Sequence, residues 1–204
     1  MTFFIHNIDF FVEFIFNLSA TILIPILIYI IIQFLTDLNI KGAKYVKKKA
    51  ESRLKNPYES LPDIIHDNIP VINFYVPDRF MSLLIALSFI RVNHLIDIYK
   101  NITCLIICLI LRSFVIGFTI LPSCIPKNRI NKKLSFYDKC FLSSHDLMFS
   151  GHTICYFFFA NILGFNIIKL IGPFLSVASR QHYTIDVLVA SVVYSYIFLI
   201  IPNF

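Results

Sequence analysis

Long apolar runs, separated by polar segments, dominate the chain. Six of them predict membrane-crossing helices, at about 14–35, 76–96, 102–121, 147–165, 167–179 and 183–201. A hydrocarbon core of about 30 Å needs roughly 20 apolar residues in a helix, and only the fifth run is much shorter. That run contains Gly172-Pro173, a pair that predicts a kink. The pattern therefore predicts an all-α integral membrane bundle of six transmembrane helices, forming one domain over residues 1–204.

Six consecutive spans place the two long polar segments, 36–75 and 122–146, at the same end of the bundle as the turn at 180–183. We name this end face A; both termini lie at the opposite end. Basic residues concentrate on face A: Lys41, Lys44, Lys47, Lys48, Lys49, Arg53, Lys55, Lys127, Arg129, Lys132, Lys133 and Lys139. The positive-inside rule places such loops in the cytoplasm, and these charges also suit contact with anionic lipids.

Composition agrees with the membrane prediction. Of the 204 residues, 57% are hydrophobic and 15% are charged, against about 45–50% apolar and about 25% charged residues in soluble domains. This excludes a water-soluble domain and a disordered chain. The net charge of +6 follows from the basic residues of face A, so we expect no nucleic-acid partner. No Cys/His spacing resembles a metal site, and we expect neither a metal nor another cofactor.

Two short stretches at face A combine ionisable residues with predicted helix starts. They are residues 145–153 (HDLMFSGHT) and 182–186 (HYTID). His182 and Asp186 are four positions apart and project from one helix face. The carboxylate can then hold the imidazole Nδ1–H and leave Nε2 as a nucleophile or base. A single such pair is more often structural, but a second histidine, His152, directly after Ser-Gly favours a phosphoryl-transfer site.

Other polar residues of these segments have two interpretations. Ser150 can cap the fourth helix, whose N-terminus favours an anion, and Gly151 lets a ligand approach the backbone closely. Arg112 lies within the third run and either binds phosphate or pairs inside the bundle. Asp63 and Asp146 either bind a cationic headgroup or cap helices. We expect only a structural role for His66, Asp67 and His94.

The two stretches resemble the paired signatures of the sphingomyelin synthase family, a branch of the type 2 lipid-phosphate phosphatase superfamily. Its acidic residue followed by Ser-Gly-His-Thr is matched by Asp146 and residues 150–153, and its His-Tyr-Thr-x-Asp-Val by residues 182–187. Residues 178–183 are also similar to plant inositol phosphorylceramide synthases. Weaker motifs occur at 61–63 and 112–122, so the resemblance covers roughly residues 60–190.

The resemblance implies an enzyme of sphingolipid metabolism with a six-helix fold. It would transfer phosphocholine, phosphoethanolamine or phosphoinositol from a glycerophospholipid to ceramide, without a metal, and release diacylglycerol. His182 would be the nucleophile, Asp186 its orienting partner and His152 the acid/base. A covalent phosphohistidine and direct activation of the ceramide hydroxyl both fit these residues. The residues expected at the substrate and its phosphate are Arg112, Asp146, Ser150, Gly151 and Tyr183.

Alternatives stay open from the sequence. A lipid-phosphate phosphatase would use the same triad with water as acceptor. The phosphatase branch has a Lys seven residues before an Arg-Pro pair, which is absent here, and an Arg where this chain has Ser176, and both differences favour a transferase. A non-catalytic lipid-binding or scrambling protein would keep only the fold. The oligomeric state is open, and a homo-oligomer is compatible with the sequence.

The side of the membrane is also open. The resembled synthases work mostly on the lumenal or outer leaflet of Golgi, endoplasmic reticulum or plasma membrane, whereas the lysines place face A in the cytoplasm. His152 and His182 are only 30 residues apart, which leaves two helical arms of roughly 20 Å each. We therefore expect the histidines to lie below the surface of face A, or the bilayer to be thinner there.

Overall fold

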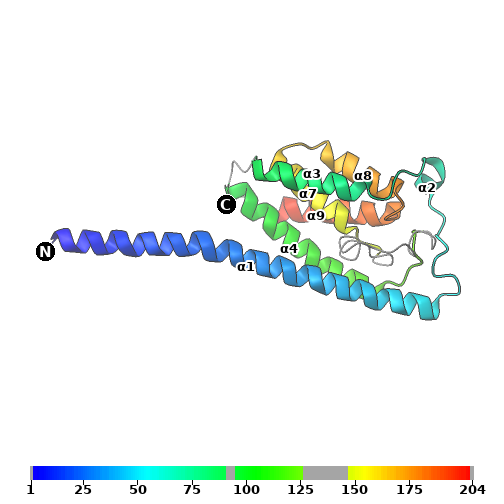
Figure 1. The fold of residues 1–204 in the computed structure, drawn as a ribbon, viewed down its shortest axis with the longest axis horizontal. Helices are drawn as coiled ribbons and strands as arrows, with labels where there is room; N and C mark the ends of the chain where they lie inside the picture. Colours follow the sequence, from blue (N-terminus) through cyan, green and yellow to red (C-terminus); the bar gives the residue numbers. More distant parts are fainter. Residues whose placement is uncertain (1, 91–94, 126–146, 203–204) are drawn as a thin grey trace.

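The chain is all-helical in the part that its computed structural model describes, which is residues 2–90, 95–125 and 147–202, with side chains described for 26–88, 98–125 and 147–202. No strand occurs among these residues, and the helices are α1 (Thr2–Arg53), α2 (Ile64–Asn68), α3 (Val76–Ile90), α4 (Leu95–Phe118), α7 (Gly151–Leu163), α8 (Ile168–Ala178) and α9 (Thr184–Ile200) (Figure 1). The predicted all-α class is confirmed. Two helical segments, Ile26–Arg53 and Ile98–Phe118, are long and apolar enough to cross a membrane.

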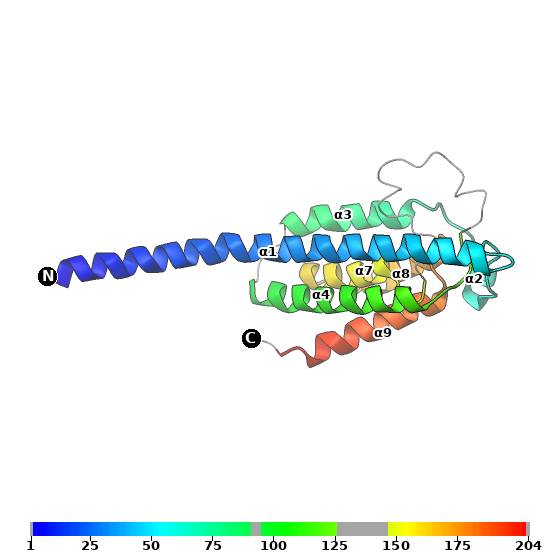
Figure 2. The ribbon, with the colours of Figure 1, turned by 90° about the horizontal axis from the view of Figure 1, so that it is seen from below.

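Helices α3, α4, α7, α8 and α9 lie along the C-terminal part of α1, and the N-terminal part of α1 extends beyond them (Figures 1 and 2). The chain direction alternates between consecutive helices. The C-terminal ends of α1, α4 and α8 therefore meet the N-terminal ends of α3, α7 and α9 at face A, where α2 also lies. The largest core cluster joins α4, α7 and α9 through residues such as Cys104, Phe157 and Tyr194.

Residues 36–53, predicted as part of a polar loop, are helical instead, because α1 continues unbroken to Arg53. The buried positions recur every three or four residues and form one stripe: Leu35, Asn39, Ala43, Val46 and Ala50. This stripe faces α4, where a Cβ on Gly42 would lie 3.7 Å from Ile116 Cγ2. The lysines occupy the other positions of the helix and are exposed or half-buried. The apolar stripe at helical spacing thus decides the structure despite the many charges.

Helix α4 begins at Leu95, seven residues before the predicted start of the third span at 102. The polar residues around position 100, expected in a tight turn, lie within the helix because they find partners there. The Lys100 ammonium lies 4.4 Å from the centroid of the Phe198 ring. Asn101 is buried and accepts a hydrogen bond of 2.9 Å from Asn161 Nδ2.

Helices α7 and α8 are short, with 13 and 11 residues, and span about 20 and 17 Å at 1.5 Å per residue. This is the short pair of arms expected between His152 and His182. Helix α8 runs through Pro173. At Gly172 it comes so close to α7 that an added Cβ would lie 2.3 Å from Cγ of Tyr156, a fully buried side chain. Only glycine permits this approach.

Candidate active site

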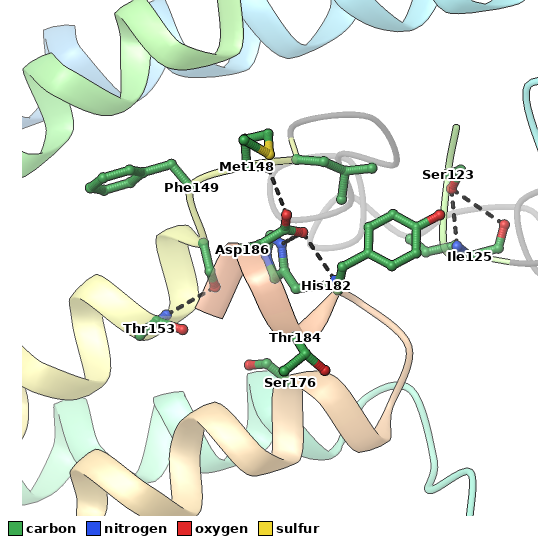
Figure 3. A network of polar contacts seen from close by, with 12 residues as sticks. Ser123, Ile125, Met148, Phe149, Thr153, Ser176, His182, Thr184 and Asp186 are labelled. Atoms are coloured by element: carbon green, nitrogen blue, oxygen red, sulfur yellow. Dashed lines mark hydrogen bonds and ion pairs between the residues drawn. The ribbon is translucent and has the colours of Figure 1, made fainter. Parts of the chain in front are cut away.

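His182 and Asp186 lie close together, but not on one helix as their spacing predicts: Asp186 is in the first turn of α9, whereas His182 is in the non-helical segment that leads into it. His182 Nδ1 is 3.5 Å from Asp186 Oδ2, and the two residues are 4% and 0% exposed. The Asp186 carboxylate also accepts hydrogen bonds from two backbone amides, those of Met148 (2.8 Å, to Oδ1) and Tyr183 (3.0 Å, to Oδ2). Figure 3 shows Asp186 between Met148 and His182. One carboxylate therefore joins the two motif stretches.

His152 lies in the first turn of α7 and has a carboxylate partner of its own. Its Nε2 is 2.8 Å from Asp78 Oδ1, on the first turn of α3. Gln181 Nε2 donates to Asp78 Oδ2 (3.4 Å) and to the Phe74 carbonyl (2.8 Å). The sequence offers no local signal for Asp78, because 74 residues separate it from His152. The only hint in the sequence is that Asp78, an ionisable residue, lies at the start of an apolar run.

The two imidazole rings are edge-to-face neighbours at face A. Their centroids are 6.0 Å apart, with an interplanar angle of 64°. A backbone hydrogen bond of 3.3 Å from the Ser150 amide to the Asp186 carbonyl fixes the start of α7 against α9. The site thus contains two histidine–carboxylate pairs, contributed by α3, α7, the segment that leads into α9 and the first turn of α9.

Arg112 lies next to Gly151, at the start of α7. It is buried at 8% exposure, its Nε donates to the Phe149 carbonyl (3.0 Å) and its Nη1 donates to Asn39 Oδ1 (2.9 Å). A Cβ on Gly151 would lie 3.2 Å from Arg112 Nε, so the group that approaches the Gly151 backbone closely is this guanidinium. Ser150 caps α7 as expected, because its Oγ accepts from the Thr153 amide (3.2 Å).

Asp63 has the geometry of a helix cap, one of its two predicted roles. Oδ1 accepts from the amide of Ile65 in α2 (3.0 Å). The carboxylate also binds Thr184 at the start of α9: Oδ2 accepts from the Thr184 amide and Oδ1 from its hydroxyl, both at 2.7 Å. Burial raises the pKa of Asp63, but the hydrogen bonds from Thr184 and His66 outweigh burial and lower the pKa below its ordinary value of 3.8.

Tyr183 and His66 hold the backbone around His182. The Tyr183 hydroxyl accepts from the Leu61 amide (2.9 Å) and donates to the Pro122 carbonyl (3.2 Å), so it joins two segments of face A. The predicted role of Tyr183 in substrate binding stays a prediction. His66 stacks on the Tyr183 ring, with centroids 5.7 Å apart, and its Nε2 donates to the His182 carbonyl (3.0 Å). This agrees with the structural role expected for His66, and burial lowers its pKa.

Two non-glycine residues of the described chain have a positive φ angle, Met148 (78°) and Arg180 (63°). Each precedes one of the site histidines by a few residues. The left-handed conformation is unfavourable for such residues, so surrounding contacts must hold it. The Met148 amide binds Asp186, and the Arg180 guanidinium donates to the carbonyls of His66 and Ile69.

Asp146 lies outside the described residues, so its predicted contact with substrate has no structural counterpart here. Comparisons with known protein families and with curated proteins find no match for the chain.

Proposed function

We propose that the protein is an integral membrane enzyme that transfers a phospho-headgroup from a glycerophospholipid to ceramide. One observation carries this proposal: the rings of His152 and His182 lie 6.0 Å apart at one end of an all-helical bundle, and each contacts its own carboxylate. Two positioned imidazoles supply what phosphoryl transfer between two hydroxyl groups requires, a nucleophile or base and an acid.

In the covalent route, the donor phosphorus binds beside the two rings and is attacked by His182 Nε2. The bond from phosphorus to the diacylglycerol oxygen breaks, and His152 gives that oxygen a proton. The primary hydroxyl of ceramide then loses its proton to His152 and attacks the phosphorus. The phosphorus–nitrogen bond breaks and its electron pair returns to His182. In the direct route, one histidine takes the ceramide proton, the hydroxyl oxygen displaces diacylglycerol from phosphorus in a single step, and the other histidine gives the leaving oxygen a proton.

Arg112 provides the positive charge for the phosphate in this proposal. Its guanidinium lies against Gly151, next to His152. The hydrogen bonds to Phe149 and Asn39 fix its plane, so little further ordering is needed when a phosphate oxygen binds. A single guanidinium suits a phosphodiester, which has one negative charge.

The membrane assignment of all the helices except α2 is part of the proposal. It is supported by large apolar side chains that are more than half exposed on the outer surface of the bundle, which lipid would cover: Leu83, Phe114, Phe118, Leu170, Leu188, Val192 and Leu199. Helices α7 and α8 are shorter than a bilayer core. Local thinning, or a site set below the surface, would give lipid substrates lateral access to the histidines.

The two orientations can be separated with a glycosylation acceptor placed in the non-helical segment 54–60, which follows α1 on face A. Modification of this acceptor in microsomes would indicate a lumenal site. An unmodified acceptor, with a control acceptor at the C-terminus modified, would indicate a cytosolic site and agree with the lysine distribution.

The transfer itself is tested with purified full-length protein in lipid–detergent micelles that contain fluorescent ceramide and a mixture of glycerophospholipids. We expect labelled phosphosphingolipid from the wild type and a loss of about 100-fold or more in His152→Ala and His182→Ala. Asp37→Asn, at an exposed position on α1, is the matched control and should retain the activity. Release of free phosphate from phosphatidic acid instead of transfer would identify the phosphatase alternative. A folded protein with neither activity would contradict the proposal.

A further inference from the structure

We infer that Asp78 is the positioning carboxylate of His152 and that it makes Nδ1 the ring nitrogen through which His152 exchanges protons with the lipids. The inference rests on the proposed transferase activity and adds a residue and an atom to its mechanism.

The tautomer follows from the contact between the two side chains. His152 Nε2 lies 2.8 Å from Asp78 Oδ1, and each side chain is 13% exposed. An ionised carboxylate can only accept hydrogen bonds, so Nε2 carries the hydrogen and donates it. In the neutral ring the lone pair is then on Nδ1. His182 is arranged in the opposite sense, because Asp186 lies against its Nδ1 and leaves Nε2 for the substrate.

Asp78 is itself held in place from the other half of the site. Gln181 is 6% exposed, and its Nε2 binds both Asp78 Oδ2 and the Phe74 carbonyl. Gln181 directly precedes His182 in the chain. The two histidine–carboxylate pairs are thus joined through Gln181, which fixes the distance between the ring of His152 and that of His182.

The proton balance of the reaction agrees with this arrangement. The His152 imidazolium carries hydrogens on both nitrogens, with Nε2–H bound to Asp78. The proton that leaves for the diacylglycerol oxygen comes from Nδ1, and the proton taken from the ceramide hydroxyl returns to Nδ1. Asp78 stays ionised throughout, and its negative charge stabilises the imidazolium.

The kinetic test compares Asp78→Asn with Asp78→Glu and with the control Asp37→Asn. We expect Asp78→Asn to lower kcat about 100-fold while KM changes less than threefold and the apparent melting temperature stays close to that of the wild type. The kcat of Asp78→Glu should be at least tenfold higher than that of Asp78→Asn. If Asp78→Asn retains full kcat, or loses stability in proportion to activity, the pair is only structural and the inference is overturned.

A second readout does not depend on activity. In protein labelled with ¹⁵N-histidine, at a pH where the ring is neutral, the His152 signals should show a protonated Nε2 and a bare Nδ1. His152→Gln assigns these signals. The opposite tautomer would overturn the inference even in an active enzyme. The expected tautomer in a protein without transfer activity would leave the Asp78 contact intact and contradict only the proposed function.

Discussion

Two groups of buried polar side chains in this bundle differ in chemistry. The dyad cluster at face A consists of two histidine–carboxylate pairs and an amide: His152, Asp78, His182, Asp186 and Gln181. The Asn101 cluster lies between α4, α7 and α9 and is neutral: Asn101 Oδ1 accepts from Asn161 Nδ2 (2.9 Å) and from the Tyr194 hydroxyl (3.4 Å). Neutral groups that bond one another stabilise helix packing in a membrane, whereas buried ionisable groups are costly and mark functional sites.

The two clusters also differ in how fully their bonds are formed. Among the described residues, the buried side-chain atoms without a hydrogen-bond partner are Thr153 Oγ1, Ser176 Oγ, Arg180 Nη1, Gln181 Oε1 and His182 Nδ1. All belong to the start of α7, or to the end of α8 and the segment that leads into α9, and none belongs to the Asn101 cluster. Two of these atoms, Gln181 Oε1 and His182 Nδ1, belong to the dyad cluster, and Asp186 Oδ2 lies 3.5 Å from His182 Nδ1. Unformed bonds are costly in a buried site, so the dyad cluster is less completely bonded than the Asn101 cluster.

Asp186→Asn should break the dyad cluster most severely. Each carboxylate oxygen accepts a backbone N–H, and an amide would turn its NH₂ group toward one of these donors. We expect transfer to fall about 1,000-fold and the melting temperature to fall as well. The labelled-ceramide assay and thermal unfolding measure the two effects. Wild-type transfer in this variant would contradict the role given to Asp186.

Gly172→Ala should have the largest effect on stability alone, because the new methyl group would overlap the Tyr156 ring. We expect a loss of roughly 2–3 kcal/mol in the free energy of unfolding. Gly117→Ala in α4 is the matched control, since nothing lies within 4 Å of its added Cβ. This control should be neutral or slightly stabilising. Equal effects of the two substitutions would contradict the close α7–α8 contact.

Asn101→Ala should separate the two clusters cleanly. Removing the shared acceptor leaves the Asn161 amide and the Tyr194 hydroxyl without it, which should cost about 1–2 kcal/mol of stability. The transfer rate per folded molecule should stay at the wild-type level, in contrast to His152→Ala. A loss of transfer in Asn101→Ala at unchanged stability would show that the clusters are not functionally distinct.

His66 should give a smaller, pH-dependent effect. Burial lowers its pKa in the folded state, opposed by Asp63 and Asp67 and supported by Arg180. The unfolded chain therefore binds more protons, and stability from this group is present above about pH 6.5 and is lost as the pH falls toward the lower folded pKa. His66→Gln should reduce the fall in melting temperature between pH 7 and pH 5 by a few degrees. An unchanged slope would exclude His66 as its source.

The all-helical class and the proximity of His182 to Asp186 could be predicted because both are encoded locally. Apolar runs define most of the helices, and His182 and Asp186 are near neighbours in the chain, although His182 precedes α9 instead of lying on its first turn. The continuation of α1 to Arg53 was wrongly predicted as a loop because the lysines hide a buried stripe. That stripe includes the polar Asn39, which is buried because it accepts a hydrogen bond from Arg112, 73 residues away.

The side chains that contact His152 from distant parts of the chain could not be predicted either. Asp78 and Gln181 reach His152 only after α3, α7 and α9 have packed, and no spacing along the chain encodes that. Gly151 illustrates the same point. The sequence predicted that some group approaches its backbone closely, but not that this group is the Arg112 guanidinium of α4.

The central claim, that His152 and His182 act on one phosphorus, is tested most directly by comparing transfer rates of His152→Ala, His182→Ala and the double variant with a radiolabelled donor. Residues that act as one unit are strongly non-additive. We predict that the double variant loses no more activity than the more impaired single variant. Losses that multiply, with all three proteins folded, would mean that the two histidines serve separate steps or sites and would contradict the claim.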